Sequence, residues 1–161
     1  MFIYKNMLDY SSWKFYNYKD LQGTQYIELA SVPSNEKIQI WGKNSLYFSD
    51  TVFSFLFSYP LHNTIKKYNL FGFAELSLDE QTKFIEELSK NYQDIMKLRS
   101  YIDVIKFSKR PGNEFRFEDM IPKNDQEILK IIEAMKCLNI LVYKFVESSI
   151  NNEHVLAILG L

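Results

Sequence analysis

Cysteine is nearly absent from this sequence of 161 residues, in which Cys137 is the single example. An internal disulfide is therefore excluded, and a reducing compartment fits this composition best. The N-terminus has no secretory leader pattern, because Lys5 interrupts the apolar run at residues 2–4. The longest apolar run, residues 52–61, has about half the length that a membrane-spanning helix needs. We therefore expect a cytoplasmic protein with no membrane partner.

Glycine and arginine are also scarce. The five glycines are scattered singly, so the sequence contains no glycine-rich loop that could bind phosphate. Only Arg99, Arg110 and Arg116 carry the guanidinium group that phosphate and base-edge recognition favours, and the net charge is −1 at pH 7. Nucleic acid is therefore not an expected partner.

Residue types that carry catalysis or bind metals are few. The two histidines, His62 and His154, have no second histidine, cysteine or carboxylate at a metal-ligand spacing. We expect surface or structural roles for both. No serine lies in a G-x-S-x-G elbow. The sequence therefore predicts no enzyme, no catalytic, cofactor-binding or metal-binding residue, and no cofactor.

Apolar residues, in contrast, are abundant, at 47% of the sequence with 16% aromatic, which suffices for the core of one domain over residues 1–161. The clearest pattern uses steps of three and four, which place one set of side chains on one helix face: Ile128, Ile131, Met135, Leu138, Val142 and Phe145. Little polar surface remains on this segment, so we expect a central helix with Ile131 and Leu138 buried. Cys137, within the same helix, is expected to be buried and unreactive.

The first part of the chain reads as an antiparallel sheet. The expected strands are residues 13–18, 24–30, 37–41, 46–48 and 68–73, separated by turns around Gly23, residues 32–35 and residues 42–44. Residues 51–59 are interpreted as a short buried helix capped by Asp50 and ended by Pro60, or as a buried strand.

Helices dominate the second part. Ser77-x-x-Glu80 is a capping box that predicts an amphipathic helix to Leu98, and Asn124-x-x-Glu127 is a second one that opens the central helix. Between these two helices the sequence allows two structures. Residues 102–107 and 114–118 could form a hairpin around the turn at 109–113, or the preceding helix could continue to Phe107. The apolar tail, residues 155–159, should pack against the body. The predicted class is α+β, with an N-terminal antiparallel sheet packed against two long C-terminal helices.

Two groups of residues are candidates for binding a partner. Trp13, Tyr16 and Tyr18 lie in a segment with aromatic side chains on both expected strand faces. One face can pack into the core, and the other is either covered by helices or exposed to a partner. Asp79, Glu80 and Glu87 lie on the polar face of the first long helix, which is either a solvated face or an acidic docking patch. Four basic residues flank the proposed hairpin turn, which is either solvated or able to hold a phosphate or an acidic partner: Lys106, Lys109, Arg110 and Arg116.

A small aromatic-rich domain without catalytic residues has the character of a protein-binding module. In size, composition and the order of strands before helices, the chain is similar to bacterial immunity proteins, which neutralise a cognate toxin such as a contact-dependent-inhibition nuclease. This resemblance implies tight binding to a toxin domain as the function. It includes no diagnostic motif, so it implies no site residue.

Two other classes remain open. One is a small-molecule-binding domain or enzyme with a pocket between sheet and helices. The other is a structural or oligomerising protein, in which a homodimer forms through the central helix or the apolar tail.

Overall fold

The computed structural model describes residues 8–23, 25–113 and 115–161. Residues 2–5, Thr24 and Glu114, which entered the sequence predictions, lie outside this part. The elements follow in the order η1 (Tyr10–Ser12), η2 (Tyr18–Asp20), β1 (Tyr26–Pro33), β2 (Leu46–Ser49), α1 (Asp50–Thr64), β3 (Phe73–Leu76), α2 (Leu78–Met96), α3 (Tyr101–Ser108), α4 (Asp125–Asn151) and β4 (His154–Gly160). The predicted α+β class is confirmed.

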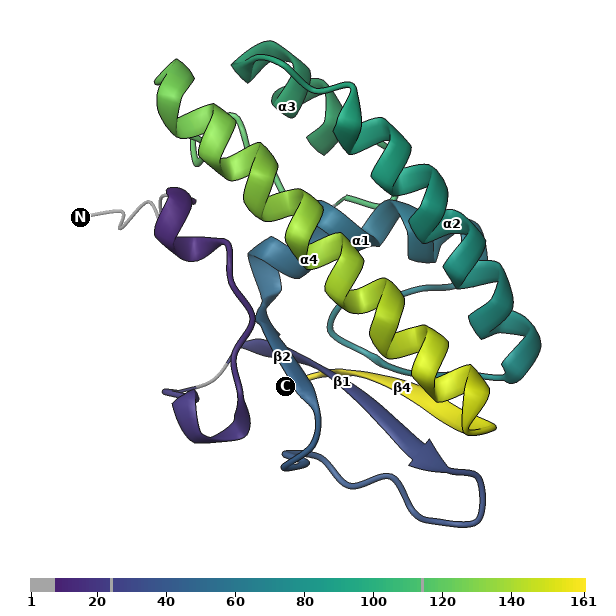
Figure 1. The fold of residues 1–161 in the computed structure, drawn as a ribbon. Helices are drawn as coiled ribbons and strands as arrows, with labels where there is room; N and C mark the ends of the chain where they lie inside the picture. The colour runs from purple at the N-terminus through teal and green to yellow at the C-terminus, as the bar shows by residue number, and fades with distance from the viewer. Residues whose placement is uncertain (1–7, 24, 114) are drawn as a thin grey trace.

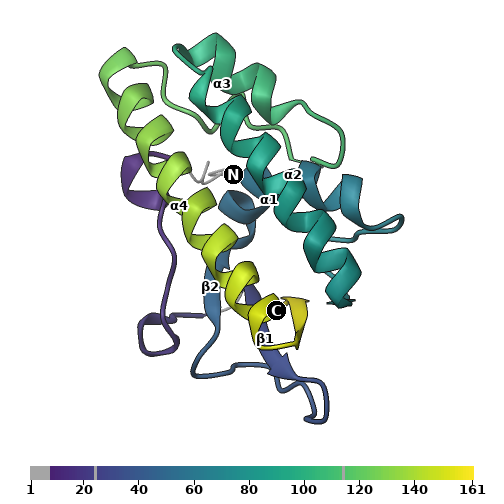
Figure 2. The same cartoon turned by 45° about the vertical axis from the view of Figure 1, so that its right-hand side comes forward.

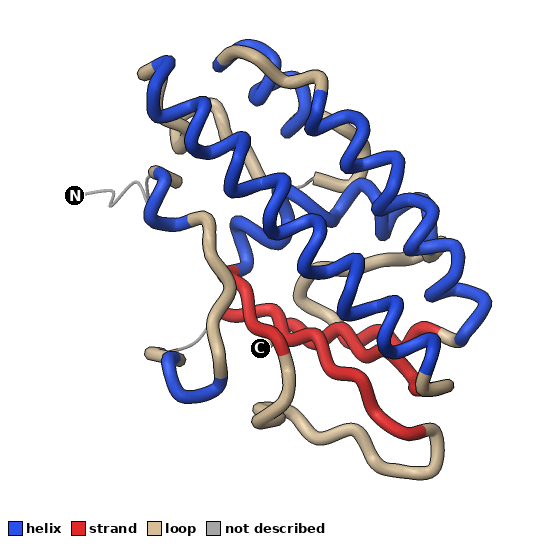
Figure 3. The backbone as a smooth tube through the Cα atoms, viewed as in Figure 1, coloured by secondary structure: helices blue, strands red, loops and turns tan. Residues whose placement is uncertain are grey.

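The four strands form one antiparallel sheet in the order β2-β1-β4-β3. Helices α1, α2 and α4 lie together against one face of this sheet (Figures 1 and 2), and loops lie below it (Figure 3). The predicted sheet lacked one strand, because β4 joins it from the C-terminal end of the chain, after α4. The apolar tail does pack against the body, but as a central strand between β1 and β3.

The core lies between the helices and the inner face of the sheet. Alternate strand residues such as Ile27, Leu29, Leu156 and Ile158 point into it. The predicted helix over residues 128–145 is confirmed as part of α4, with Ile131 fully buried and Leu138 only 5% exposed. Cys137 is exposed, however, and the expectation that it is buried is wrong. It lies between Lys136 and Leu138, and its side chain is on the exposed strip of the helix that also carries Glu133 and Lys144.

Both long helices begin as predicted. Ser77 and Glu80 form the complete capping box of α2. At α4, Asn124 Oδ1 accepts hydrogen bonds from the backbone N–H groups of Gln126 and Glu127. The Glu127 carboxylate does not complete that box. It accepts a hydrogen bond from the Tyr10 backbone N–H at 2.7 Å and so ties the N-terminal segment to α4.

Helix α1 is longer than predicted and includes Pro60. Ser49, not Asp50, is its N-cap. Proline has no backbone N–H, so the carbonyl of Leu56, four residues earlier, loses its helical donor. Asn91 Nδ2 from α2 replaces that donor at 3.0 Å, and it also donates to Asn139 Oδ1 from α4 at 2.8 Å. A buried asparagine pair thus joins three helices at the proline and satisfies a carbonyl that would otherwise be unpaired in the core.

Three segments predicted as strands form other structures. Residues 13–17 lie between two short 3-10 helices, with only an isolated bridge from Tyr16 to Tyr47, and Tyr18 begins the second of these helices. Residues 37–41 belong to the long loop between β1 and β2, where Trp41 has φ 60°, which an extended strand does not adopt. Residues 68–72 precede β3, which begins only at Phe73.

The predicted hairpin after α2 is also wrong, and the helical alternative is closer. Residues 101–108 form the separate helix α3, because Ser100 Oγ accepts a hydrogen bond from the Asp103 N–H and starts a new helix. The turn after α3 includes Gly112, whose φ of +96° favours glycine. A Cβ atom at this position would also lie only 2.8 Å from the Ser58 carbonyl oxygen. Among the described residues, no helix has the length and apolarity needed to cross a bilayer.

Candidate functional site

Two neighbouring surfaces near the outer face of the sheet are the strongest candidates for function. They are the polar cavity inside the β1–β2 connection and the uncovered edge around β3. The long loop of residues 34–45, which joins β1 to β2, borders both surfaces.

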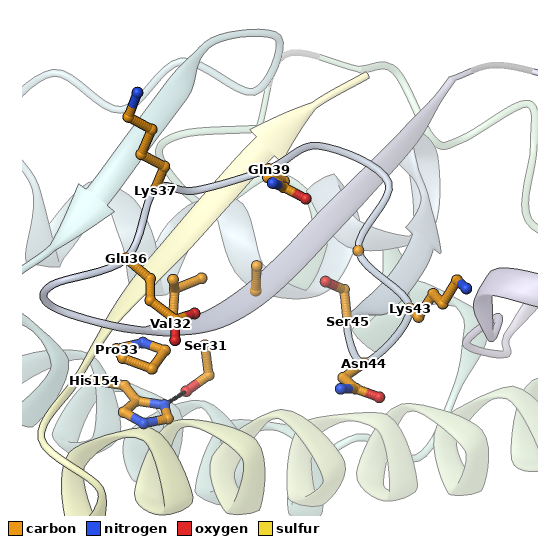
Figure 4. A pocket seen from close by; sticks show the side chains of 12 residues that line it. Ser31, Val32, Pro33, Glu36, Lys37, Gln39, Lys43, Asn44, Ser45 and His154 are labelled. Atoms are coloured by element: carbon orange, nitrogen blue, oxygen red, sulfur yellow. Dashed lines mark hydrogen bonds between the residues drawn. The ribbon is translucent and has the colours of Figure 1, made fainter.

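The cavity forms because the β1–β2 hairpin opens. Strand β2 pairs only with residues 26–29 of β1, so residues 30–33 have a strand neighbour on the β4 side alone. The chain between the strands encloses a hollow of about 620 Å³ (Figure 4), which is lined by Ala30, Ser31, Val32, Pro33, Glu36, Lys37, Gln39, Gly42, Lys43, Asn44, Ser45 and His154. The ammonium groups of Lys37 and Lys43 point away from this hollow, so its lining is polar rather than cationic.

A buried carboxylate holds the far end of the loop. Glu28, fully buried on the outer face of β1, accepts hydrogen bonds from the N–H groups of Trp41 and Gly42, each at 2.8 Å. The Tyr47 hydroxyl donates to the Gly42 carbonyl at 2.6 Å. Burial raises the pKa of Tyr47 well above its usual range, and the Glu28 carboxylate adds to this effect. The loop is therefore anchored by groups that lie under it.

Ser31 and His154 face each other at the other end of the cavity. Ser31 Oγ lies 3.0 Å from His154 Nδ1, a hydrogen bond between the end of β1 and the start of β4 (Figure 4). The His154 carbonyl accepts from Gln81 Nε2 at 2.8 Å, which fixes the backbone of this residue. Among the described residues, no carboxylate hydrogen-bonds to the His154 ring. This geometry can exchange a proton between hydroxyl and imidazole and can bind a polar ligand.

Sequence reasoning gave His154 a surface or structural role and did not single out Ser31. The two residues are 123 positions apart, and only the pairing of β1 with β4 brings them together. His62, in the last turn of α1, is exposed and does not line this cavity. Within the described part of the chain, no group of three or more His, Cys, Asp or Glu side chains could hold a metal ion.

The aromatic candidates differ in their surroundings. Trp13 is only 5% exposed, packs edge-on against Phe55 and donates from Nε1 to the Leu8 carbonyl. It is a core residue, so Trp13, although it was a binding candidate, offers a partner almost no surface. Tyr16 is half-buried against Tyr26, whereas Tyr18 is exposed. Of these three aromatic residues, only Tyr16 and Tyr18 have exposed side-chain surface that a partner could contact.

The acidic candidates do not form a free patch. Asp79 is exposed, but Glu80 is engaged in the capping box of α2. Glu87 accepts hydrogen bonds from Asn63 Nδ2 at 3.1 Å and from Lys90 Nζ at 3.0 Å. Two of these three carboxylates therefore have local structural roles.

Arg110 is not positioned to hold an external phosphate. Its guanidinium lies 3.6 Å from the ring centroid of Phe107 and 4.5 Å from that of Tyr59, and it pairs with Asp94 at 3.4 Å. Burial lowers its pKa, and Asp94 partly offsets that effect. Lys109 pairs with Glu118, whereas Lys106 and Arg116 are exposed.

A surface with exposed apolar side chains lies elsewhere, around β3 and the adjoining loops. A small cluster of Ala30, Ala157 and Leu159 lies on the outer face of the sheet, with Val32 and Ile38 packed against it. Beside it, Phe73 is 58% exposed and lines a hollow of about 400 Å³ together with Val32, Ile38 and Val155. Phe71 and Ile40, in the adjoining loops, are similarly exposed. Sequence reasoning missed this surface because its residues come from four separate segments.

Comparison of the chain with protein-family models, with curated proteins and with solved structures finds no match in any of the three.

Proposed function

We propose that the protein acts by binding another protein, and that the outer face of the sheet around Phe73 is the contact surface. The observation that carries this proposal is the difference between the two faces. Helices bury the inner face, whereas a single loop covers part of the outer one and leaves Phe73 58% exposed beside a hollow lined by both apolar and charged side chains. Large aromatic side chains at such positions are typical of binding surfaces, because they bury much area with few rotors to fix.

Neutralisation of a toxin is the specific form of this function that the general character of the sequence suggests. An immunity protein needs a rigid surface and no reacting groups. The anchored loop and the four-stranded sheet supply a scaffold of that kind. The partner would then be a toxin domain, and the gene next to the one for this protein is the first to test.

The proposal is tested by placing a photo-crosslinking amino acid at Phe73 in the native host. A matched control carries the same group at Ile102 of α3, which is equally apolar and 63% exposed but lies at the opposite end of the molecule (Figures 1 and 2). We expect one crosslinked protein from position 73 and none from position 102. Equal labelling from both positions, or labelling from neither, contradicts the assignment of this surface.

A second assay uses function directly. Expression of the neighbouring gene product should harm cells that lack this protein, and co-expression of this protein should protect them. Phe73→Asp should abolish protection while leaving the melting temperature nearly unchanged, because the side chain is largely exposed. Protection that survives Phe73→Asp points to a different surface, such as Tyr16 and Tyr18.

A second candidate function rests on the polar cavity. Its volume of about 620 Å³ and its Ser31–His154 pair suit a small polar ligand. Native mass spectrometry of the purified protein should then show a retained small molecule that Ser31→Ala and His154→Ala both release. An unmodified mass in the wild type argues against this function.

A further inference from the structure

The backbone of β3 has a free hydrogen-bonding edge. Strand β3 ends the sheet, with β4 as its one strand neighbour. Gly160 donates to the Gly72 carbonyl at 3.0 Å, which fixes the residue pair 72 and 160 as hydrogen-bonded. In an antiparallel ladder such pairs alternate, so Ala74 and Leu76 direct their backbone groups to β4. The N–H and C=O groups of Phe73 and Glu75 therefore point away from the sheet.

These four groups have no partner within the described chain. None of them takes part in a hydrogen bond to another loop, helix or side chain there. The strand is short and carries the charged Glu75, but within the described chain neither proline nor a covering helix blocks its edge. An extended backbone, whose donors and acceptors repeat every two residues, can satisfy all four groups.

The side chains beside this edge define what such a strand would carry. Phe73 and Glu75 both project from the outer face, two residues apart, and both are exposed. A neighbouring strand would place one side chain opposite each of them. Phe73 favours an apolar partner, and the Glu75 carboxylate favours a lysine or arginine.

We propose that β3 accepts an extended segment of a partner protein as a fifth strand, with an apolar residue opposite Phe73 and a basic residue opposite Glu75. This inference rests on the proposed protein-binding function and gives its mode of recognition. Main-chain hydrogen bonds to Phe73 and Glu75 supply affinity, and the two outward side chains supply selectivity.

The test selects binders from a phage-displayed library of random twelve-residue peptides on the wild-type protein. Selected peptides should carry an apolar and a basic residue at positions two apart. They should bind Glu75→Ala only a few-fold more weakly than the wild type, because an exposed ion pair contributes little. They should bind Glu75→Pro roughly tenfold or more weakly than Glu75→Ala, because proline also removes an outward N–H. Glu75→Lys should shift the selected charge from basic to acidic.

Proline at position 75 should leave the β4 ladder intact, because the hydrogen-bonded pairs lie at Ala74 and Leu76. If that variant unfolds, amide hydrogen exchange on the wild type gives the same information. The Phe73 and Glu75 amides should become protected when a selected peptide binds. Equal binding to Glu75→Pro, or unprotected amides at both positions, overturns strand addition.

Other outcomes separate this inference from the function on which it rests. A wild-type dimer that Glu75→Pro dissolves identifies a second copy of this chain as the occupant and overturns the partner segment. A library that yields no peptide of the expected pattern also overturns strand addition. Crosslinking from Phe73 decides the binding function independently, because it requires contact at this face and no particular backbone geometry.

Discussion

The two faces of the sheet are built by different means. The inner face packs against three helices, and its residues belong to one continuous apolar cluster that includes the central residues of α4. The outer face carries a small cluster of three buried residues, and a loop that a buried glutamate anchors covers part of it. The contrast indicates that the inner face holds the fold together, while the outer face presents a surface at a low cost in stability.

The largest difference should appear when one side chain is truncated on each face. Leu138→Ala should lower the free energy of unfolding by about 2–5 kcal/mol, because it leaves a cavity in a packed core. Phe73→Ala should lower it by less than about 1 kcal/mol, because the ring is largely exposed. Urea unfolding of both variants measures this difference. Equal losses would remove the distinction between the faces.

The asparagine pair of the inner layer can be separated from ordinary apolar packing. Asn91→Ala should cost about 1–3 kcal/mol, because it leaves the Leu56 carbonyl and the Asn139 Oδ1 atom without a donor in the core. In a Pro60→Ala background the cost should be smaller, because the new N–H at position 60 can donate to Leu56. A double-mutant cycle measures the coupling. Strict additivity would show that Asn91 does not compensate for the proline.

The stability that Tyr47 contributes under the loop of residues 34–45 should decrease at alkaline pH. The pKa of Tyr47 is raised in the folded protein, so the unfolded chain loses this proton first, near pH 10. The stabilising contribution of Tyr47 is thus complete below about pH 10 and decreases as the pH rises above it. Tyr47→Phe should cost about 0.5–1.5 kcal/mol at neutral pH through the lost bond to Gly42, and it should flatten the alkaline decline.

Unfolding curves at pH 7 to 11 for the wild type and Tyr47→Phe measure this effect. Tyr16→Phe is the control, because burial also raises the pKa of Tyr16, but to a lesser extent. An alkaline decline that is unchanged by Tyr47→Phe would contradict the role of this hydroxyl under the loop.

The smallest effect concerns the solvent side of the helical layer. Cys137 is exposed on α4, so a thiol reagent should label the native protein stoichiometrically. Cys137→Ser should change the stability by no more than about 0.5 kcal/mol. Labelling that occurs only after unfolding would place this face of α4 inside the protein and would change the description of the helical layer.

Local signals predicted the two long helices, α2 and α4, well. The capping residues Ser77 and Asn124 are read directly from the sequence, and the apolar repeat of α4 needs no distant partner. Burial of Trp13 and the loop at residues 37–41 could not be read in this way. The burial of Trp13 depends on its contact with Phe55. The loop at residues 37–41 has the alternating pattern of a strand, but its end is held by Glu28, which accepts hydrogen bonds from the backbone of Trp41 and Gly42.

The candidate sites were less predictable than the fold. The Ser31–His154 contact and the free edge at Phe73 both depend on the position of β4 in the sheet. The sequence of β4 is mostly apolar, and nothing in it indicates which strands it pairs with. Predicted binding at Tyr16, Tyr18 and Asp79 remains a prediction, because the structure shows their exposure and not a partner.

The central position of β4 has a consequence for biosynthesis. Residues 27–33 pair with residues 154–160, and β3 has its hydrogen-bonded neighbour in β4 alone. A ribosome that synthesises the chain from its N-terminus delivers β4 after all the other elements. Until then, β1 and β2 can form only an isolated two-stranded ribbon, and β3 has no strand to pair with. Sheet formation therefore completes after translation of this segment, and during synthesis the nascent chain exposes β1 and β3 edges that the finished protein partly covers.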